Sequence, residues 1–182
     1  MRVYNHGNGA RPKAAMLVAA GVWLAVMLTA ATLVAGCARR RPEVQPAFPI
    51  PCIWPTPAAA RTVTSDFGVI RSAGGGGSRR HQGIDISAPK GWPVFATADG
   101  VVSRVDRDRR GYGRYVVLSH ANGYSTLYAH LSKVSVKQGA RVRAGETIGA
   151  IGRTGRATGY HLHYEVRRNG QPVNPRAYLP AR

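Results

Sequence analysis

The sequence predicts an all-β domain of antiparallel strands over residues 61–180. Three pairs of short apolar runs are each separated by an Asp-Gly or Asn-Gly dipeptide, which is a strong hairpin signal. The links between these pairs are short, and none shows the apolar period of an amphipathic helix. Successive hairpins without intervening helices are typical of antiparallel folds.

The predicted hairpins follow one another along the chain. With their turn dipeptides, they cover residues 93–105 (Asp99-Gly100), 115–131 (Asn122-Gly123) and 161–173 (Asn169-Gly170). Residues 134–152 alternate β-branched residues with spaced glycines, which predicts strands joined by tight corners. The run AGGGGS at 73–78 lacks the lysine and the strand-to-helix context of a phosphate-binding loop, so we expect a flexible loop there.

The first 36 residues differ in character from the β-rich part. Three basic residues precede an uncharged apolar run over residues 14–35. The run ends in small residues before Cys37, and this pattern resembles a bacterial lipobox. We therefore expect residues 1–36 to be a lipoprotein signal peptide and Cys37 to become the lipidated first residue. An uncleaved membrane anchor is the alternative, because an apolar run of this length can also span a bilayer.

Both interpretations attach the protein to a membrane of the cell envelope. The three arginines at 39–41 balance the N-terminal charges, so the positive-inside rule does not decide the orientation. Ala38 resembles the sorting pattern for the outer membrane, which predicts a position on its periplasmic face. Inner-membrane anchoring is the alternative.

The charge of the chain favours anionic partners. The 26 basic residues outnumber eight acidic ones, and loss of the signal peptide with its three basic residues still leaves a net charge of +15. Nucleic acid is excluded, because no helical recognition motif is present and an exported chain rarely meets DNA. Anionic lipid headgroups and envelope polymers fit the expected address. A basic surface that only keeps the protein soluble is the alternative.

Residues 37–60 are predicted to be a linker. Prolines at positions 42, 46, 49, 51, 55 and 57 disfavour helix and sheet, which predicts a semi-rigid spacer. With Cys37 assigned to the lipid, Cys52 has no partner for an internal disulfide, and we assign it no function.

Residues 81–85, HQGID, place a histidine and an aspartate four positions apart. On a strand, His81, Gly83 and Asp85 share a face, and the glycine leaves that face open between two side chains that can bind a metal. The H-x-x-x-D spacing alone is a weak indication, because it often arises by chance.

Residues 160–164, YHLHY, carry two histidines one residue apart. On a strand, His161 and His163 point to one side, while Leu162 and Tyr164 point to the other and can pack into the core. Two imidazoles on a buried face need polar partners, whereas on an exposed face they would be ordinary surface residues.

The two motifs together match a catalytic zinc site. Such a site commonly has three protein ligands and one open position. His81, Asp85 and either His161 or His163 meet that count, and one histidine is then left for acid-base chemistry.

Three blocks resemble a known family. They are HQGIDISAPKGWPVFATADGVV at 81–102, GYGRYVVLSHANGYSTLYAHLS at 111–132 and TGRATGYHLHYEVRRNGQPVNP at 154–175. These blocks are similar to successive segments of the LytM/lysostaphin-type zinc metallopeptidases, over roughly residues 62–179. The resemblance implies the family's duplicated hybrid motif, a barrel-sandwich hybrid of hairpins with an open active-site groove.

The resemblance also implies site residues. In the family, H-x-x-x-D supplies two ligands and the second histidine of H-x-H supplies the third, which maps one zinc ion onto His81, Asp85 and His163. The family's two further active-site histidines correspond to His130 and His161. We expect these two to be catalytic, as general base or as stabilisers of the oxyanion, without dividing the roles between them.

We make a separate prediction for each of three further residues. Glu165 either orients a ligand histidine or lies on the surface of its strand. His120 precedes a predicted turn and is expected to be structural. Tyr160 stands where relatives often have proline or a small residue, and it could narrow one wall of the cleft.

The resemblance implies a zinc-dependent endopeptidase that hydrolyses peptide crosslinks of peptidoglycan. A non-catalytic peptidoglycan-binding regulator is the alternative, because relatives that activate cell-wall amidases keep this fold but lose zinc ligands. This chain keeps all the ligand positions. A third interpretation is a basic lipoprotein that tethers the wall to the membrane without hydrolysis.

Overall fold

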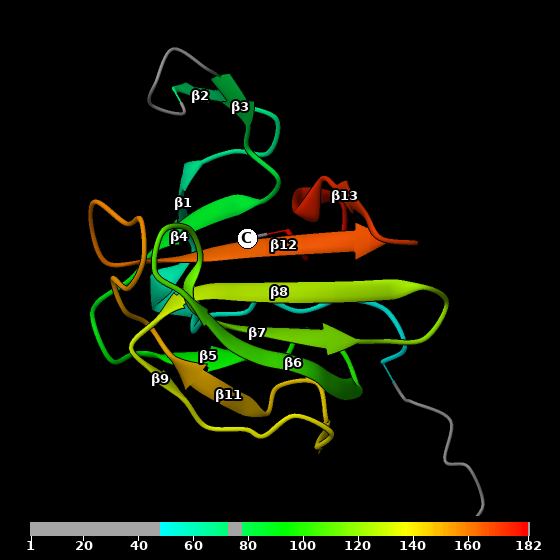
Figure 1. Cartoon of the computed structure of the whole chain (residues 1–182). Helices are drawn as coiled ribbons and strands as arrows, with labels where there is room; N and C mark the ends of the chain where they lie inside the picture. Colours follow the sequence, from blue (N-terminus) through cyan, green and yellow to red (C-terminus); the bar gives the residue numbers. More distant parts are fainter. Residues whose placement is uncertain (1–47, 73–77, 182) are drawn as a thin grey trace, which may run out of the picture. The chain divides into compact units, whose positions relative to one another are not determined.

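The computed structural model describes residues 48–72 and 78–181, and these form an antiparallel all-β structure (Figure 1). The helical elements in this part are two short 3-10 turns, η1 (Ala58–Ala60) and η2 (Pro175–Ala177). The predicted fold class is confirmed. Within the described ranges, no helix has the length and apolarity needed to cross a membrane. The apolar run 14–35, Cys37 and residues 73–77 of the glycine-rich run lie outside the described residues.

The largest sheet has eight strands, in the order β1-β4-β12-β8-β7-β6-β10, with β13 also paired to β12. Its strands are β1 (Thr62–Ser65), β4 (Ile84–Ser87), β6 (Gly100–Asp108), β7 (Gly113–Ser119), β8 (Tyr124–Leu131), β10 (Arg141–Val142), β12 (His161–Arg168) and β13 (Gln171–Val173). A smaller sheet has the order β5-β11-β9, with strands β5 (Pro93–Phe95), β9 (Lys133–Val134) and β11 (Thr147–Ala150). A separate ribbon pairs β2 (Ile70–Ser72) with β3 (Ser78–Arg80).

The hydrophobic core lies between the large and the small sheet. Leu162 and Tyr164 of β12 are fully buried there, together with Ile148 of the small sheet. The predicted packing side of YHLHY is therefore confirmed. The buried hydroxyl groups of Tyr128 and Tyr164 each lie 3.0 Å from the Thr97 hydroxyl, so these polar groups are satisfied inside the core.

The second and third predicted hairpins are present. β7 pairs with β8 around Asn122-Gly123, and β12 pairs with β13 around Asn169-Gly170. Both residues of each dipeptide have positive φ, 58° and 73° in the first turn and 50° and 80° in the second. Asn and Gly adopt this region most easily, which explains why these signals were reliable.

The first predicted hairpin is wrong. β5 pairs with β11 in the small sheet, whereas β6 pairs with β7 and β10 in the large one. The residues between them carry the chain from one sheet to the other. The Asp99 carboxylate accepts hydrogen bonds from the backbone N–H groups of Phe48 and Ala144. A Cβ at Gly100 would lie 2.5 Å from the Ser119 carbonyl oxygen, so a glycine is needed for close packing.

The described end of the predicted linker packs on the domain. Trp54 is 5% exposed and belongs to the main core, and its indole N–H donates to the Pro180 carbonyl over 3.1 Å. Ala60 is also buried in the core. The folded domain therefore begins earlier than the expected boundary at residue 61.

Candidate metal centre

Two adjacent strands bring the HQGID and YHLHY motifs together. β4 pairs with β12 in a register that sets Asp85 directly opposite His163. Residues directly opposite each other in an antiparallel pair project from the same face. This face is opposite to the one where Leu162 and Tyr164 enter the core.

His81 reaches the same point from outside the strand. β4 begins at Ile84, so the expectation that His81, Gly83 and Asp85 share one strand face is wrong. A Cβ at Gly83 would lie 2.3 Å from the Tyr164 carbonyl oxygen. The glycine therefore allows the β12 backbone to approach closely, rather than opening a strand face.

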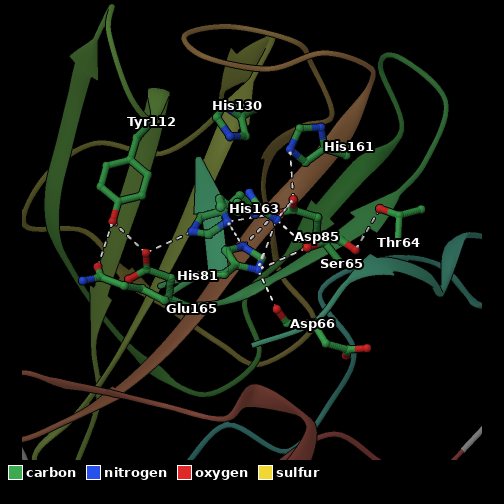
Figure 2. A network of polar contacts seen from close by, with 12 residues as sticks. Thr64, Ser65, Asp66, His81, Asp85, Tyr112, His130, His161, His163 and Glu165 are labelled. Carbon is green, nitrogen blue, oxygen red and sulfur yellow. Dashed lines mark hydrogen bonds and ion pairs between the residues drawn. The ribbon is translucent and has the colours of Figure 1, made fainter. Parts of the chain in front are cut away.

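The three expected ligands converge on one point (Figure 2). His81 Nε2 lies 3.2 Å from Asp85 Oδ1 and 3.0 Å from His163 Nδ1, and His163 Nδ1 lies 2.9 Å from Asp85 Oδ1. All three residues are buried. Ligand atoms of a tetrahedral ion with bonds of about 2.0–2.2 Å lie roughly 3.3–3.6 Å apart, so a slight outward shift of these side chains would accommodate such an ion.

The outer nitrogens of both histidines have fixed partners. His81 Nδ1 donates to the Asp66 carbonyl over 2.8 Å, and His163 Nε2 donates to Glu165 Oε1 over 2.9 Å. Each ring therefore turns a nitrogen lone pair toward Asp85. Two lone pairs and a carboxylate oxygen at these distances repel one another, and a cation between them removes the repulsion. The donor set fits zinc, and its outer partners are of the type that orients metal-bound histidines.

Protonation of the centre opposes metal binding. Burial disfavours the charged form of His163, but hydrogen bonds to Asp85 and Glu165 raise its pKa overall. Burial acts in the other direction on Asp85, yet the His163 and His81 rings, which donate to Asp85 when their inner nitrogens are protonated, hold the pKa of Asp85 well below its usual range. A metal ion must therefore displace a proton from the centre, which makes metal affinity weaker in acid.

Glu165 is a buried supporting residue of the centre. Its side chain has no exposed area, and Oε1 accepts from the Tyr112 hydroxyl over 2.7 Å as well as from His163. Arg167 donates to Oε2 over 2.8 Å. Of the two expectations for Glu165, the structure places it behind His163 and excludes the strand surface.

His130 reaches the centre through a β-bulge. The register between β7 and β8 shifts near the end of β8, and His130 has a φ of 62°. A bulge redirects side chains, and this one turns the His130 ring toward the metal centre, where it lies 4.7 Å from the ring of His161. Regular alternation from Tyr128 would have placed His130 in the core instead.

His130 and His161 present similar nitrogens to the cleft. His130 Nδ1 donates to the Thr154 carbonyl over 2.8 Å, and His161 Nδ1 donates to the Gly159 carbonyl over 3.0 Å. Each Nε2 is then an acceptor, and that of His161 lies 3.9 Å from Asp85 Oδ2. Burial, with smaller contributions from His161 and His163, lowers the pKa of His130 to about 4, so it is neutral at pH 7.

The centre lies at the floor of a cleft of about 820 Å³. Tyr160 is 43% exposed and lines this cleft, with the Arg153 guanidinium 5.5 Å from its ring centre. His120 lies outside the cleft and bridges the Asp99 carbonyl and the Thr126 hydroxyl. Both ring nitrogens of His120 are thus used in contacts within the fold, which agrees with the structural role expected for this residue.

Sequence reasoning did not single out two residues of the site. Tyr112 supports Glu165, and Arg71 Nη2 donates to Asp85 Oδ2 over 2.6 Å. Tyr112 lies in the Gly-Tyr-Gly run at 111–113, where glycines on both sides of an aromatic residue were the available signal. Arg71 is one of many arginines, and no local pattern distinguishes it.

Comparisons with known proteins agree with this geometry. The model of peptidase family M23 matches residues 79–175, which is more than half of the chain. The chain belongs to peptidase family M23. The resemblance to LytM/lysostaphin-type proteins is thereby confirmed.

Two solved peptidase structures share the fold. A zinc-containing peptidase from Vibrio cholerae has a TM-score of 0.66 and 38% identity, over 70% of this chain and 40% of that one. The catalytic domain of lysostaphin from Staphylococcus simulans has a TM-score of 0.59 and 30% identity, over 65% of this chain and 91% of that one.

Curated relatives of the chain include a peptidase and an activator of hydrolases. The DD-carboxypeptidase/endopeptidase Mpg of Neisseria meningitidis serogroup B is 61% identical over 97 residues, which are 53% of this chain and 22% of the relative. The murein hydrolase activator NlpD of Salmonella dublin is 39% identical over 129 residues, which are 71% of this chain and 31% of the relative. The matches thus span about a fifth to a third of these relatives' length.

Proposed function

We propose that this M23 protein is a zinc-dependent endopeptidase that hydrolyses peptide crosslinks of peptidoglycan. The observation that carries the proposal is the convergence of His81, Asp85 and His163, with the imidazole rings of His130 and His161 beside them. A binding module needs neither a preformed metal site nor two further imidazoles beside it.

The chain's own residues supply positioning and proton transfer. His81, Asp85 and His163 would hold the zinc ion, which when bound polarises a scissile carbonyl and lowers the pKa of a coordinated water to about 7. Nε2 of His130 or of His161 accepts a proton from the nucleophile and can return it to the leaving amine. The other imidazole, once protonated, stabilises negative charge on the carbonyl oxygen.

The similarity to Mpg supports the crosslink as substrate, because that relative is named as an endopeptidase. The similarity to NlpD favours a second candidate, a regulator that activates other murein hydrolases. The intact ligand set favours the enzyme over the regulator.

A cleavage assay separates these functions. The full chain, purified in detergent, is incubated with crosslinked muropeptides with and without a chelator, beside His163→Ala, His161→Ala and the remote control Arg141→Gln. We expect His163→Ala to lose both zinc and cleavage, and His161→Ala to keep zinc but lose about 10²–10⁴-fold in rate. Arg141→Gln should match the parent. Zinc-loaded parent that leaves crosslinks intact but stimulates a cell-wall amidase would establish the regulator instead.

The proposed site of action is the cell envelope, with the protein attached to a membrane through lipidated Cys37 and facing the periplasm from the outer membrane. Inner-membrane anchoring through residues 14–35 is the alternative. The lipobox resemblance supports the first proposal. Cys37→Ala should abolish incorporation of labelled fatty acid and shift the protein away from the outer-membrane fraction. An unchanged distribution would favour the uncleaved anchor.

A further inference from the structure

The β2–β3 ribbon presents two arginines beside the metal centre. Its register sets Arg71 directly opposite Arg79, so both side chains project from the same face of the ribbon. Both residues line the cleft. Like charges directly opposite each other on paired strands are destabilising, and an anion bound between them would offset this repulsion.

Arg71 is held in place but retains unused donors. Its Nη2 lies 2.6 Å from Asp85 Oδ2 and 2.6 Å from Ser65 Oγ. Within the described ranges, the hydrogen bonds that this side chain donates all come from Nη2. A guanidinium carries five N–H groups, so Nε and Nη1 remain as donors, and 41% of the side chain is exposed.

Arg79 is the more exposed member of the pair. In residues 48–72 and 78–181, no carboxylate forms an ion pair with it. The carboxylates that line the cleft are engaged elsewhere. Asp85 belongs to the metal centre, Glu165 is held by Arg167, and Asp108 accepts from the backbone N–H of Arg110. No carboxylate of the described residues therefore competes with a ligand anion for Arg79.

We infer that Arg71 and Arg79 bind a carboxylate of the substrate peptide, on the residue next to the scissile amide. The inference rests on the proposed function and adds a preference for acidic crosslinks over neutral ones. Proximity follows from the 2.6 Å contact between Arg71 and Asp85, which sets the pair directly beside the metal ligands. Guanidinium groups match the fork geometry of a carboxylate better than any other side chain.

The test compares two crosslinked muropeptide dimers that differ only beside the scissile amide. One carries a free carboxyl group there, and the other carries its amide. The zinc-loaded full chain, Arg79→Gln and Arg141→Gln are each assayed for kcat/KM on both dimers. Arg141 is the matched control, because it is an exposed arginine on β10, at the opposite edge of the large sheet from β1.

We expect the parent to favour the acid over the amide by about tenfold. Arg79→Gln should reduce this ratio about fivefold by slowing cleavage of the acid alone, whereas Arg141→Gln should leave it unchanged. Equal rates of the parent on both dimers, or an equal loss on both in Arg79→Gln, would overturn the inference.

Failure of the proposed function gives a different result. If the zinc-loaded parent cleaves neither dimer, the proposed function fails, and binding of the two labelled dimers is measured by fluorescence anisotropy. Tighter binding of the acid that Arg79→Gln abolishes supports the carboxylate site independently of catalysis. Equal binding of the acid and the amide overturns it.

Discussion

Replacing Glu165 with glutamine tests the support behind the metal centre. The carboxylate is fully buried and uses both oxygens, Oε1 toward His163 and Tyr112 and Oε2 toward Arg167. A glutamine has only one acceptor oxygen, so its NH₂ group must face either His163 and Tyr112 or Arg167, all of which are hydrogen-bond donors. In one orientation His163 loses its acceptor, in the other Arg167 meets a second donor, and in both the ion pair with Arg167 is lost.

The expected loss can be worked from these contacts. Removing the acceptor behind a metal-bound histidine typically costs 10- to 100-fold in metal affinity, or about 1.4–2.7 kcal/mol. We expect the upper half of that range, because Glu165 has no access to water that could replace the lost acceptor. The zinc affinity of Glu165→Gln should therefore fall about 30- to 100-fold.

The assay is competition for zinc against a chelator of known affinity, with folding checked by circular dichroism. Tyr112→Phe is the matched control. Burial, together with Glu165, raises the pKa of Tyr112, so its hydroxyl stays protonated and donates. Losing this donor leaves the carboxylate in place, and we expect a change of less than about fivefold. If folded Glu165→Gln binds zinc as tightly as the parent, the carboxylate does not orient His163 and the reasoning is refuted.

Three further predictions concern stability and specificity. Burial lowers the pKa of His120, so below about pH 6.5 the unfolded chain binds a proton at this residue more readily than the folded chain, and the free energy of unfolding falls as the pH falls. In denaturant unfolding between pH 5 and 7, the free energy of unfolding of His120→Gln should therefore depend less on pH than that of the parent. The same pH dependence in both proteins would contradict this. Gly83→Ala places a methyl group 2.3 Å from the Tyr164 carbonyl oxygen and should lower the free energy of unfolding by about 1–3 kcal/mol. An unchanged melting temperature would contradict this expectation. Tyr160→Gly removes an exposed wall of the cleft and should alter KM for muropeptides more than kcat, whereas a change in kcat alone would rule out a role in substrate contact.

Local patterns predicted the faces of β12 correctly but not every connection. Leu162 and Tyr164 are buried because alternation along a strand is a local property. Asp99-Gly100 has the same composition as a hairpin turn, yet Asp99 binds backbone groups of Phe48 and Ala144, which are 51 and 45 residues away in sequence. The change of sheet depends on these distant contacts, which a dipeptide cannot reveal.

The site was predictable only in part from residue patterns. Alternation alone assigns His130 to the core side with Tyr128, and the family resemblance was needed to bring it to the cleft. The bulge that turns it depends on pairing with β7. The burial of Glu165 likewise depends on Tyr112, 53 residues earlier in the chain. Such features arise from strand pairing, so no window of neighbouring residues contains them.

The pairing of Asp85 with His163 links correct folding to metal uptake. A slip of one residue between β4 and β12 turns every side chain of the slipped strand to the opposite face. In a misaligned molecule, one ligand would enter the core and the centre could not assemble. Metal binding, and with it the proposed hydrolase activity, therefore requires the native alignment of β4 and β12, so misaligned chains would be inactive.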